Sequence, residues 1–303
     1  REPIFVSVRS SATAEDLGDA SFAGQQSSFI NVKGNPELIQ KVKECFASIF
    51  TARSIYYRKK KGFEGLVGIA AIVQKMINSD KSGVMFSRNP VKNNEEILVE
   101  AVFGQGEGIV SGKIKPDQHT LTREMELIEE KIADKKVAII RTSGGQTKTI
   151  QLTPEKSTQR VLKTYELKQL ADFAIKLEEH YENPQDIEFA IENEDIYILQ
   201  TRPITTLKKK SESDEKEADL DGQVLTEGMA ASPGVASGTV KIIYSMDDLG
   251  KIKQGDILVT KMTNPDMVVT MQKAAAILTS EGGVTAHAAI VSREMGIPAI
   301  VGA

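Results

Sequence analysis

The chain has 303 residues, 40% of them hydrophobic and 26% charged, a composition typical of a soluble globular protein with about two domains. Its formal net charge of −4 gives no indication of the positive surface that nucleic-acid binding requires. The sequence contains no run of 18 apolar residues, the length needed to predict a membrane-spanning helix. With a single cysteine, Cys45, the chain can form neither an intrachain disulfide nor a cysteine-rich zinc site, which fits a reducing, cytoplasmic setting. From charge, hydropathy and cysteine content together, we expect a cytoplasmic protein that binds neither nucleic acid nor membranes.

The N-terminal stretch predicts a strand over Ile4–Arg9 and then a loop of small residues that reaches Gln25. Such loops can bind phosphates through backbone N–H groups and hydroxyls, and Arg9 at the strand end could bind a phosphate. The alternative is an ordinary surface loop. Neither a Walker A pattern nor a strict GxGxxG occurs, so a nucleotide site here must be of another type.

The next elements follow from hydrophobic periodicity. We predict helices over Pro36–Lys60 and Arg160–Tyr181, because apolar residues recur there at helical spacing. Strands are expected over Ile69–Gln74, Gly83–Ser87 and Ile97–Phe103. The last of these strands contains Glu100, and an acid among apolar neighbours is unusual unless it is paired or binds something.

The segment Gln185–Pro203 predicts a β-hairpin that turns near Asn193. Glu188 and Gln200 are polar residues within its apolar strands, and two such oxygen ligands suit Mg²⁺. They can share a metal only if both point to one face of the hairpin. We therefore predict a three-residue or bulged loop that places Glu188 opposite Gln200, with Arg202 on the same face. A half-exposed hairpin with polar residues facing water is the alternative.

Residues Thr206–Asp221 mark a boundary between two domains. Ten of the fourteen residues from Lys208 to Asp221 are charged and none is aromatic, so this segment cannot form a core of its own. We expect a flexible linker that proteases cut within Lys208–Asp219.

The C-terminal stretch predicts a strand over Ala274–Thr279, a turn at Gly282-Gly283 and a helix over Thr285–Met295 with His287 in its first turn. A helix N-terminus favours a neutral imidazole, which can attack a phosphoryl group, and its N–H donors then stabilise the new anion. The alternative is a histidine that makes only a local hydrogen bond.

The sequence around His287 resembles the phosphohistidine signature of the phosphoenolpyruvate-utilising enzymes, through the stretch GGVTAHAAIVSREMGIPAIVG. That resemblance implies that His287 carries phosphate between two distant active sites. Thr285 matches the threonine that a regulatory kinase phosphorylates in some members. Position 286 is often Cys or Ser in the family and is Ala here.

Upstream stretches resemble the nucleotide-binding domain of the phosphoenolpyruvate synthases, a variant of the ATP-grasp fold. The similar stretches are RSSATAEDLGDASFAGQ, GIAAIVQKMINSDKSGVMFSRNPV, EAVFGQGEGIVSG and IEFAIENEDIYILQTRP. By this resemblance Arg9 and Arg202 contact phosphate and Glu100 contacts the nucleotide. Glu188 and Gln200 match the Mg²⁺ ligands.

The same resemblance places Gly24 and Ser28 in the loop at the nucleotide. It assigns the adenine hinge to Gln74, Lys75 and Met76. The family's phosphate-binding lysine would lie upstream of Arg1. Its pyruvate-binding barrel would follow Ala303, so we interpret both ends as cuts through a longer protein.

The fold class expected is α/β (α+β), with a partial ATP-grasp domain at 1–205, a charged linker at 206–222 and a swivelling β/α phosphohistidine domain at 223–303, truncated at its C-terminus. The resemblance implies a cytoplasmic enzyme of gluconeogenesis that makes phosphoenolpyruvate from ATP, pyruvate and water, with Mg²⁺, and releases AMP and phosphate. A rifampin-type antibiotic phosphotransferase and a non-catalytic phosphocarrier remain alternatives. We expect the present chain alone to be inactive on pyruvate.

Overall fold

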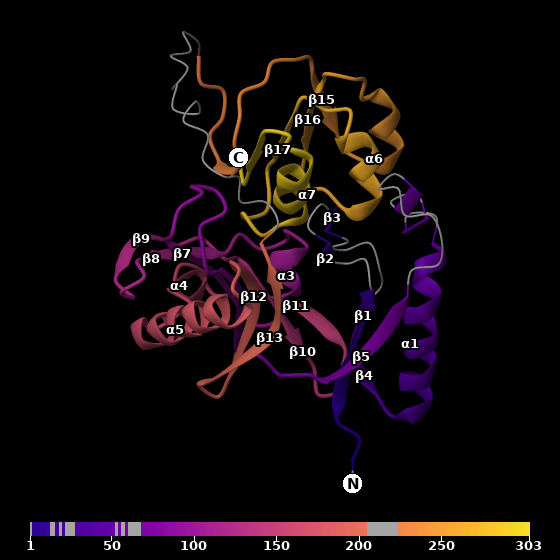
Figure 1. The fold of residues 1–303 in the computed structure, drawn as a ribbon, viewed down its shortest axis with the longest axis vertical. Coiled ribbons are helices and arrows are strands. Elements are labelled where there is room, and N and C mark those ends of the chain that lie inside the picture. Colours follow the sequence, from indigo (N-terminus) through magenta and orange to yellow (C-terminus); the bar gives the residue numbers. More distant parts are fainter. Residues whose placement is uncertain are drawn as a thin grey trace.

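The computed structural model describes residues 2–12, 16–17, 20–21, 28–51, 54–55, 58–59, 68–204 and 223–303. Within these ranges the chain forms sheets of three, six and five strands and two ribbons of two strands each. The five-stranded sheet and its helices lie above the other two sheets in Figure 1. The mixed α/β class that the sequence predicts is confirmed. In the described part of the chain, no helix is long and apolar enough to cross a lipid bilayer.

The three-stranded sheet has the order β4-β1-β5, with β1 at Phe5–Ala12, β4 at Phe29–Lys33 and β5 at Ile69–Lys75. Both strand pairs are antiparallel. One face packs against α1 (Asn35–Ala47) through a core of Val8, Val32 and Cys45. Because side chains alternate along a strand, Arg9 lies on the opposite face. The short strands β2 (Asp16–Leu17) and β3 (Ala20–Ser21) form a separate ribbon.

The helix predicted over Pro36–Lys60 is interrupted: α1 covers its first part, and among the described residues after Thr51 helix returns at 54–55 and 58–59. Helix α1 ends at Ala47 and continues as a 3₁₀ turn at Ser48–Phe50, where the Ser48 hydroxyl donates to the Cys45 carbonyl at 2.7 Å. Such a side-chain bond to the backbone competes with helix continuation.

Only some of the apolar residues of this helical segment face the core. Ile39, Phe46 and Phe50 are 56%, 43% and 62% exposed, whereas Cys45 and Ile49 are buried. Two neighbouring apolar columns run along this helix, and the three-stranded sheet covers only one of them.

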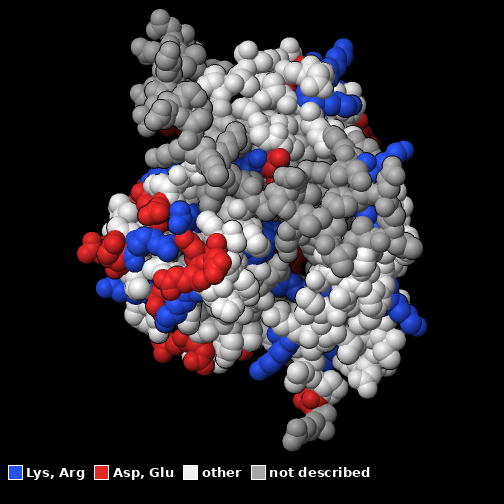
Figure 2. All heavy atoms as spheres, in the orientation of Figure 1, with Lys and Arg blue, Asp and Glu red and all other residues white. Residues whose placement is uncertain are grey.

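The six-stranded sheet is antiparallel throughout and has the order β13-β12-β6-β7-β8-β9. Its strands are β6 (Lys81–Phe86), β7 (Ile97–Phe103), β8 (Asp117–Leu121), β9 (Leu127–Lys131), β12 (Gln185–Glu192) and β13 (Asp195–Pro203). One face packs against α5 (Thr164–Tyr181) through Leu167 and Leu170. The predicted strands and hairpin are thus confirmed. Figure 2 shows acidic and basic side chains interspersed on the side of the molecule that holds α5.

Helix α5 begins four residues later than predicted. The Val161 N–H donates to the Asp117 carboxylate at 2.9 Å, which directs the chain toward β8 before the helix starts. The Lys163 N–H donates to Glu166 at 2.6 Å, an N-terminal capping contact. Tyr165 and Tyr181, two aromatic residues of this helix, are 44% and 48% exposed.

The remaining elements of this part connect the larger ones. They are α3 (Glu107–Val110), the ribbon of β10 (Val137–Arg141) and β11 (Thr147–Gln151), and α4 (Pro154–Ser157).

A fully buried ion pair joins Lys135 to Asp117 of β8. Removing one partner of such a pair leaves an uncompensated charge in the core. We expect Lys135→Ala to lower the free energy of unfolding by about 3 kcal/mol or more. Lys131→Ala is the control, because Lys131 is 59% exposed in its pair with Glu129 and should cost less than about 1 kcal/mol. Urea unfolding of both variants checks this, and equal losses would contradict it.

The five-stranded sheet has the order β14-β18-β17-β16-β15. Its strands are β14 (Met229–Ser232), β15 (Val240–Ile243), β16 (Ile257–Thr260), β17 (Ala276–Thr279) and β18 (Ala299–Val301). All pairs are parallel except β14 with β18. Helices α6 (Val268–Met271) and α7 (His287–Met295) pack on the sheet through a common core. The 3₁₀ turn Met246–Lys251 lies between β15 and β16, and the 3₁₀ turn Pro265–Met267 directly precedes α6.

The predicted strand, turn and helix around His287 are confirmed, although the helix begins at His287 rather than Thr285. The Ala286 N–H bonds to the Gly283 carbonyl, so the preceding residues form a turn. Gly296 follows the helix at φ 65°, the left-handed conformation expected of a C-terminal glycine cap. The charged linker proposed at 206–222 lies outside the described residues.

Candidate active site between the sheets

The β12–β13 hairpin places Glu188 directly opposite Gln200, as predicted. The sequence predicts a three-residue or a bulged loop, and the three-residue form is wrong, because Glu192 pairs with Asp195 across a turn of Asn193 and Glu194. Both turn residues have positive φ, 51° and 71°, the conformation of a tight two-residue hairpin turn. The register changes between Glu188 and Phe189, so Leu199 forms a bulge that returns Gln200 to the face of Glu188.

Arg9 of β1 in the three-stranded sheet contacts both side chains of the six-stranded sheet. We use the name cleft for the facing surfaces of the two sheets that carry Arg9, Glu188 and Gln200. The Arg9 Nη2 atom donates to Glu188 Oε2 at 2.9 Å and also to Gln200 Oε1. The side chains of Arg9 and Glu188 are 23% and 35% exposed. Two oxygen atoms from neighbouring strands therefore converge on one cationic nitrogen.

Arg202 lies one step further along the same face, where it binds Asp186. Its Nε and Nη2 atoms donate to Asp186 Oδ2 at 2.9 and 2.7 Å. The charge of Asp186 raises the pKa of Arg202, with a further contribution from Glu188. Our sequence reasoning missed Asp186, although the alternation that aligns Glu188 with the cleft places Asp186 on the same face.

The predicted hinge residues lie at the end of β5. Gln74 donates through Nε2 to the carbonyl of the bulged Leu199 at 3.0 Å, and the Met76 N–H donates to the Phe5 carbonyl at 3.0 Å. Lys75 is exposed. The hinge segment therefore connects β1 to the bulge that sets the position of Gln200.

Two loop residues complete the predicted nucleotide contacts. Ser28 is exposed just before β4. Gly24 lies outside the described residues, so only Ser28 has a position here.

Glu100 lies on the cleft face in the same cross-strand row as Glu188. The register pairs Glu188 with Val84 of β6 and Val84 with Glu100 of β7. Two strand spacings separate the backbones of the two acids, about 10 Å. Glu100 is 0% exposed.

The Glu100 carboxylate accepts hydrogen bonds from the segment that precedes His287. The Val284 N–H donates to Oε1 at 3.0 Å, and the Thr285 N–H donates to Oε2 at 3.2 Å. The Thr285 hydroxyl also donates to Oε2. Burial raises the pKa of the Glu100 carboxyl, and these hydrogen bonds offset part of that shift.

His287 is the first residue of α7, and its ring contacts Thr263. Thr263 Oγ1 lies 2.8 Å from His287 Nδ1. The sequence analysis did not predict a role for Thr263. The parallel order of β16 and β17 could have indicated it, because the loops that follow these two strands leave the same edge of the sheet and bring their residues together. This contact holds the His287 ring through its Nδ1 atom.

The double glycine before His287 permits a close approach to the six-stranded sheet. A Cβ atom on Gly283 would lie 2.9 Å from Glu100 Oε1 and 3.0 Å from Pro116 Cγ. Gly282 has φ 102°, a conformation that side chains disfavour.

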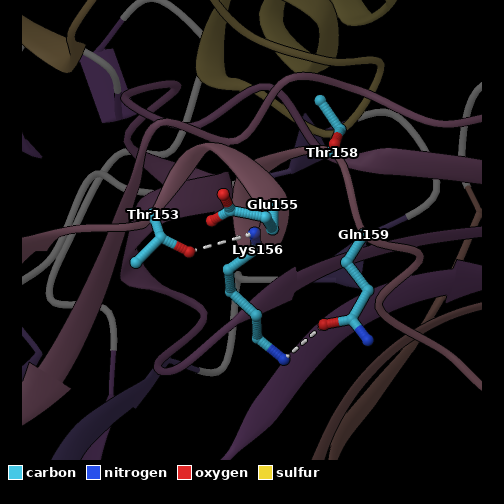
Figure 3. Close-up of a pocket in the computed structure, with 5 residues that line it drawn as sticks. All are labelled: Thr153, Glu155, Lys156, Thr158 and Gln159. Carbon is cyan, nitrogen blue, oxygen red and sulfur yellow. Dashed lines mark hydrogen bonds between the residues drawn. The ribbon is translucent and has the colours of Figure 1, made fainter.

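A hollow of about 420 Å³ lies elsewhere, next to α4. Figure 3 shows the side chains that line it, including the Lys156–Gln159 hydrogen bond of 2.9 Å. None of the residues predicted for the nucleotide or for phosphate transfer contributes to it. The complete lining is Thr153, Glu155, Lys156, Thr158 and Gln159.

Comparison with known families accounts for this arrangement. Residues 1–223 match the pyruvate phosphate dikinase AMP/ATP-binding domain, and residues 252–303 match the mobile domain of PEP-utilising enzymes. The chain belongs to the family defined by the pyruvate phosphate dikinase AMP/ATP-binding domain. The first match contains Arg9, Glu188 and Gln200, and the second contains His287.

Several archaeal family members are similar over the whole chain. A probable phosphoenolpyruvate synthase of Archaeoglobus fulgidus is 53% identical over 99% of this chain and 40% of its own length. The phosphoenolpyruvate synthase of Pyrococcus furiosus is 49% identical over 100% of this chain and 38% of its own length. The chain thus spans about two fifths of the length of these curated relatives.

Proposed function

We propose that this chain is the nucleotide-binding and phosphohistidine part of an enzyme that makes phosphoenolpyruvate from ATP, pyruvate and water. The names of its relatives support this reaction. The single observation that carries the proposal is the contact of the His287 segment with Glu100, in the row that contains Glu188. The candidate nucleophile thereby lies over the cleft of the charged residues.

The nucleotide occupies the cleft in this proposal. Arg9 and Arg202 bind its phosphates, since guanidinium groups match phosphate oxygens. Both arginines now pair with carboxylates of β12, so a phosphate would take over these charges on binding.

The base of the nucleotide lies at the β5 end of the cleft. In this proposal the segment Gln74, Lys75 and Met76 contacts adenine, and Gly24 and Ser28 belong to the loop at the nucleotide. The apolar side chain of Ile72 on β5 is 47% exposed and offers a surface for a base.

Magnesium fits Glu188 and Gln200. Their oxygens converge on one cationic atom of Arg9, so they can share one cation. Among the described residues no group of three or more His, Cys, Asp or Glu side chains is arranged for a metal. Two protein ligands suit Mg²⁺, which takes its other ligands from phosphates and water. Bound there, it supplies charge neutralisation for the phosphates.

His287 is the nucleophile. Its Nε2 lone pair attacks the β-phosphorus of ATP, the bond from that phosphorus to the AMP oxygen breaks, and AMP leaves. Hydrolysis of the resulting pyrophosphoryl group releases inorganic phosphate and leaves one phosphoryl group on Nε2, which pyruvate then accepts. Thr263 orients the ring through Nδ1. The donors at the start of α7 stabilise the anion.

Domain movement then carries the phosphate to pyruvate. We propose the domains 1–205 and 223–303 with a linker at 206–222; the separate family matches at 1–223 and 252–303 support a division into two parts. A regulatory kinase acting on Thr285 would need this segment to leave Glu100, because Thr285 is 2% exposed. We place the enzyme in the cytoplasm, in gluconeogenesis.

An assay of the intact protein tests the proposal. With ATP, Mg²⁺ and pyruvate, we expect equal amounts of phosphoenolpyruvate, AMP and phosphate. Product formation that uses inorganic phosphate as a substrate would indicate a dikinase of the pyruvate phosphate type. Transfer to rifampin instead of pyruvate would indicate an antibiotic phosphotransferase.

A further inference from the structure

We propose that Glu100 is a positioning residue that anchors the segment before His287 onto the nucleotide-binding part, so that its carboxylate contacts protein rather than nucleotide. The expected consequence, faster phosphoryl transfer from ATP to His287, rests on the proposed function. The anchoring contact itself rests only on the geometry around Glu100.

Both oxygens of the Glu100 carboxylate are used by neighbouring protein groups. Oε1 accepts from the Val284 N–H and, at 3.4 Å, from Gln118 Nε2. Oε2 accepts from the N–H and the hydroxyl of Thr285. A carboxylate with four such donors and no exposed surface is committed to this contact.

The Val284 peptide is bound on both of its sides. Its N–H donates to Glu100, and its carbonyl accepts from Arg293 Nη2 at 2.8 Å. Arg293 also donates through Nη1 to the Ala231 carbonyl at 2.9 Å, which ties the same turn to β14. Burial lowers the pKa of Arg293 to about 10, so its guanidinium is still charged at neutral pH.

These contacts fix the start of α7 relative to the cleft. Only Ala286 separates Thr285 from His287, and Gly283 approaches Glu100 too closely for any side chain. Glu100 therefore determines how far His287 lies from ATP phosphates that bind beside Glu188 in the proposed mechanism. It is a positioning residue because it acts through Val284 and Thr285.

Glu100→Gln in the intact protein is the first test. One amide oxygen cannot replace both carboxylate oxygens, so whichever way the amide turns, an NH₂ group faces a donor of Val284 or Thr285. We expect phosphorylation of His287 by ATP to slow by about 10- to 100-fold, since hydrogen bonds to a charged group are lost. ATP affinity and phosphorylation of His287 from phosphoenolpyruvate should change less than about 3-fold.

Glu166→Gln is the matched control. Glu166 is a buried carboxylate that binds Lys81 at 2.7 Å, away from the His287 segment. It should lower stability while leaving the ratio of the two phosphorylation rates unchanged. Equal slowing of both rates in Glu100→Gln, or a large loss of ATP affinity, would overturn the inference and favour a structural or nucleotide-binding role.

Hydrogen exchange tests the anchor without using the reaction. We expect the peptide that contains Val284 and Thr285 to exchange at least about 10-fold faster in Glu100→Gln than in the unmodified protein. Thr285→Val should give a smaller increase, because the two amide bonds persist, and Thr285→Ser should give little. Unchanged exchange in Glu100→Gln would refute the anchor. If the unmodified protein acquires no phosphate on His287 while Glu100→Gln still accelerates exchange, the proposed function fails and the anchor stands.

Discussion

Replacing His287 by alanine should abolish phosphoenolpyruvate formation in the intact protein while ATP still binds. In the proposed mechanism the His287 side chain supplies the attacking nitrogen, and removing a covalent nucleophile costs roughly 10⁴-fold or more in rate. The groups assigned to ATP, including Arg9 and Glu188, lie on other strands and keep their contacts. Product analysis and equilibrium binding of ATP measure the two effects separately.

His180→Ala is the control for this variant, because His180 is an exposed histidine on α5. It should retain full activity. Retention of AMP–ATP exchange by His287→Ala would contradict the phosphohistidine assignment, since exchange requires the covalent intermediate.

Replacing Glu188 by alanine should weaken binding of Mg-ATP by at least about 10-fold, an effect typical of a damaged metal site. Binding of ATP without Mg²⁺ should be unchanged or tighter, because Arg9 loses its carboxylate partner and keeps its positive charge for phosphate. Titration calorimetry with and without Mg²⁺ distinguishes these two outcomes.

Glu194→Ala removes a carboxylate from the tip of the same hairpin, where the side chain is 71% exposed and pairs with Lys163. It should leave both affinities unchanged. If Glu188→Ala weakened ATP binding equally with and without Mg²⁺, Glu188 would contact the nucleotide or stabilise the cleft rather than bind a metal.

The hairpin shows how far sequence patterns extend. Alternation and the chemistry of Glu188 and Gln200 predicted that they face each other, and they do. The same reasoning placed the extra residue in the turn, whereas the chain inserts Leu199 as a bulge within the strand. One extra residue shifts the strand register by the same amount whether it lies in the turn or in a bulge. The alternation of polar and apolar residues in one strand pair therefore cannot show which of the two is present.

Contacts between distant segments were the main omission. Nothing local to Thr263 indicates that it meets His287, because their contact depends on the order of parallel strands. Glu100 was noticed as an acid in an apolar strand, but its partners Val284 and Thr285 lie more than 180 positions away. The periodicity of α1 likewise could not tell which of its two apolar columns the small sheet would cover.

The most direct test of the central claim follows each phosphate of ATP separately. The intact protein is incubated with Mg²⁺ and ATP labelled at either the β- or the γ-phosphorus, without pyruvate, and the peptide that contains His287 is isolated under alkaline conditions. We predict that the β label remains on His287 and that the γ label appears as inorganic phosphate. Stable γ label on His287, or β label on any other residue, would contradict the account.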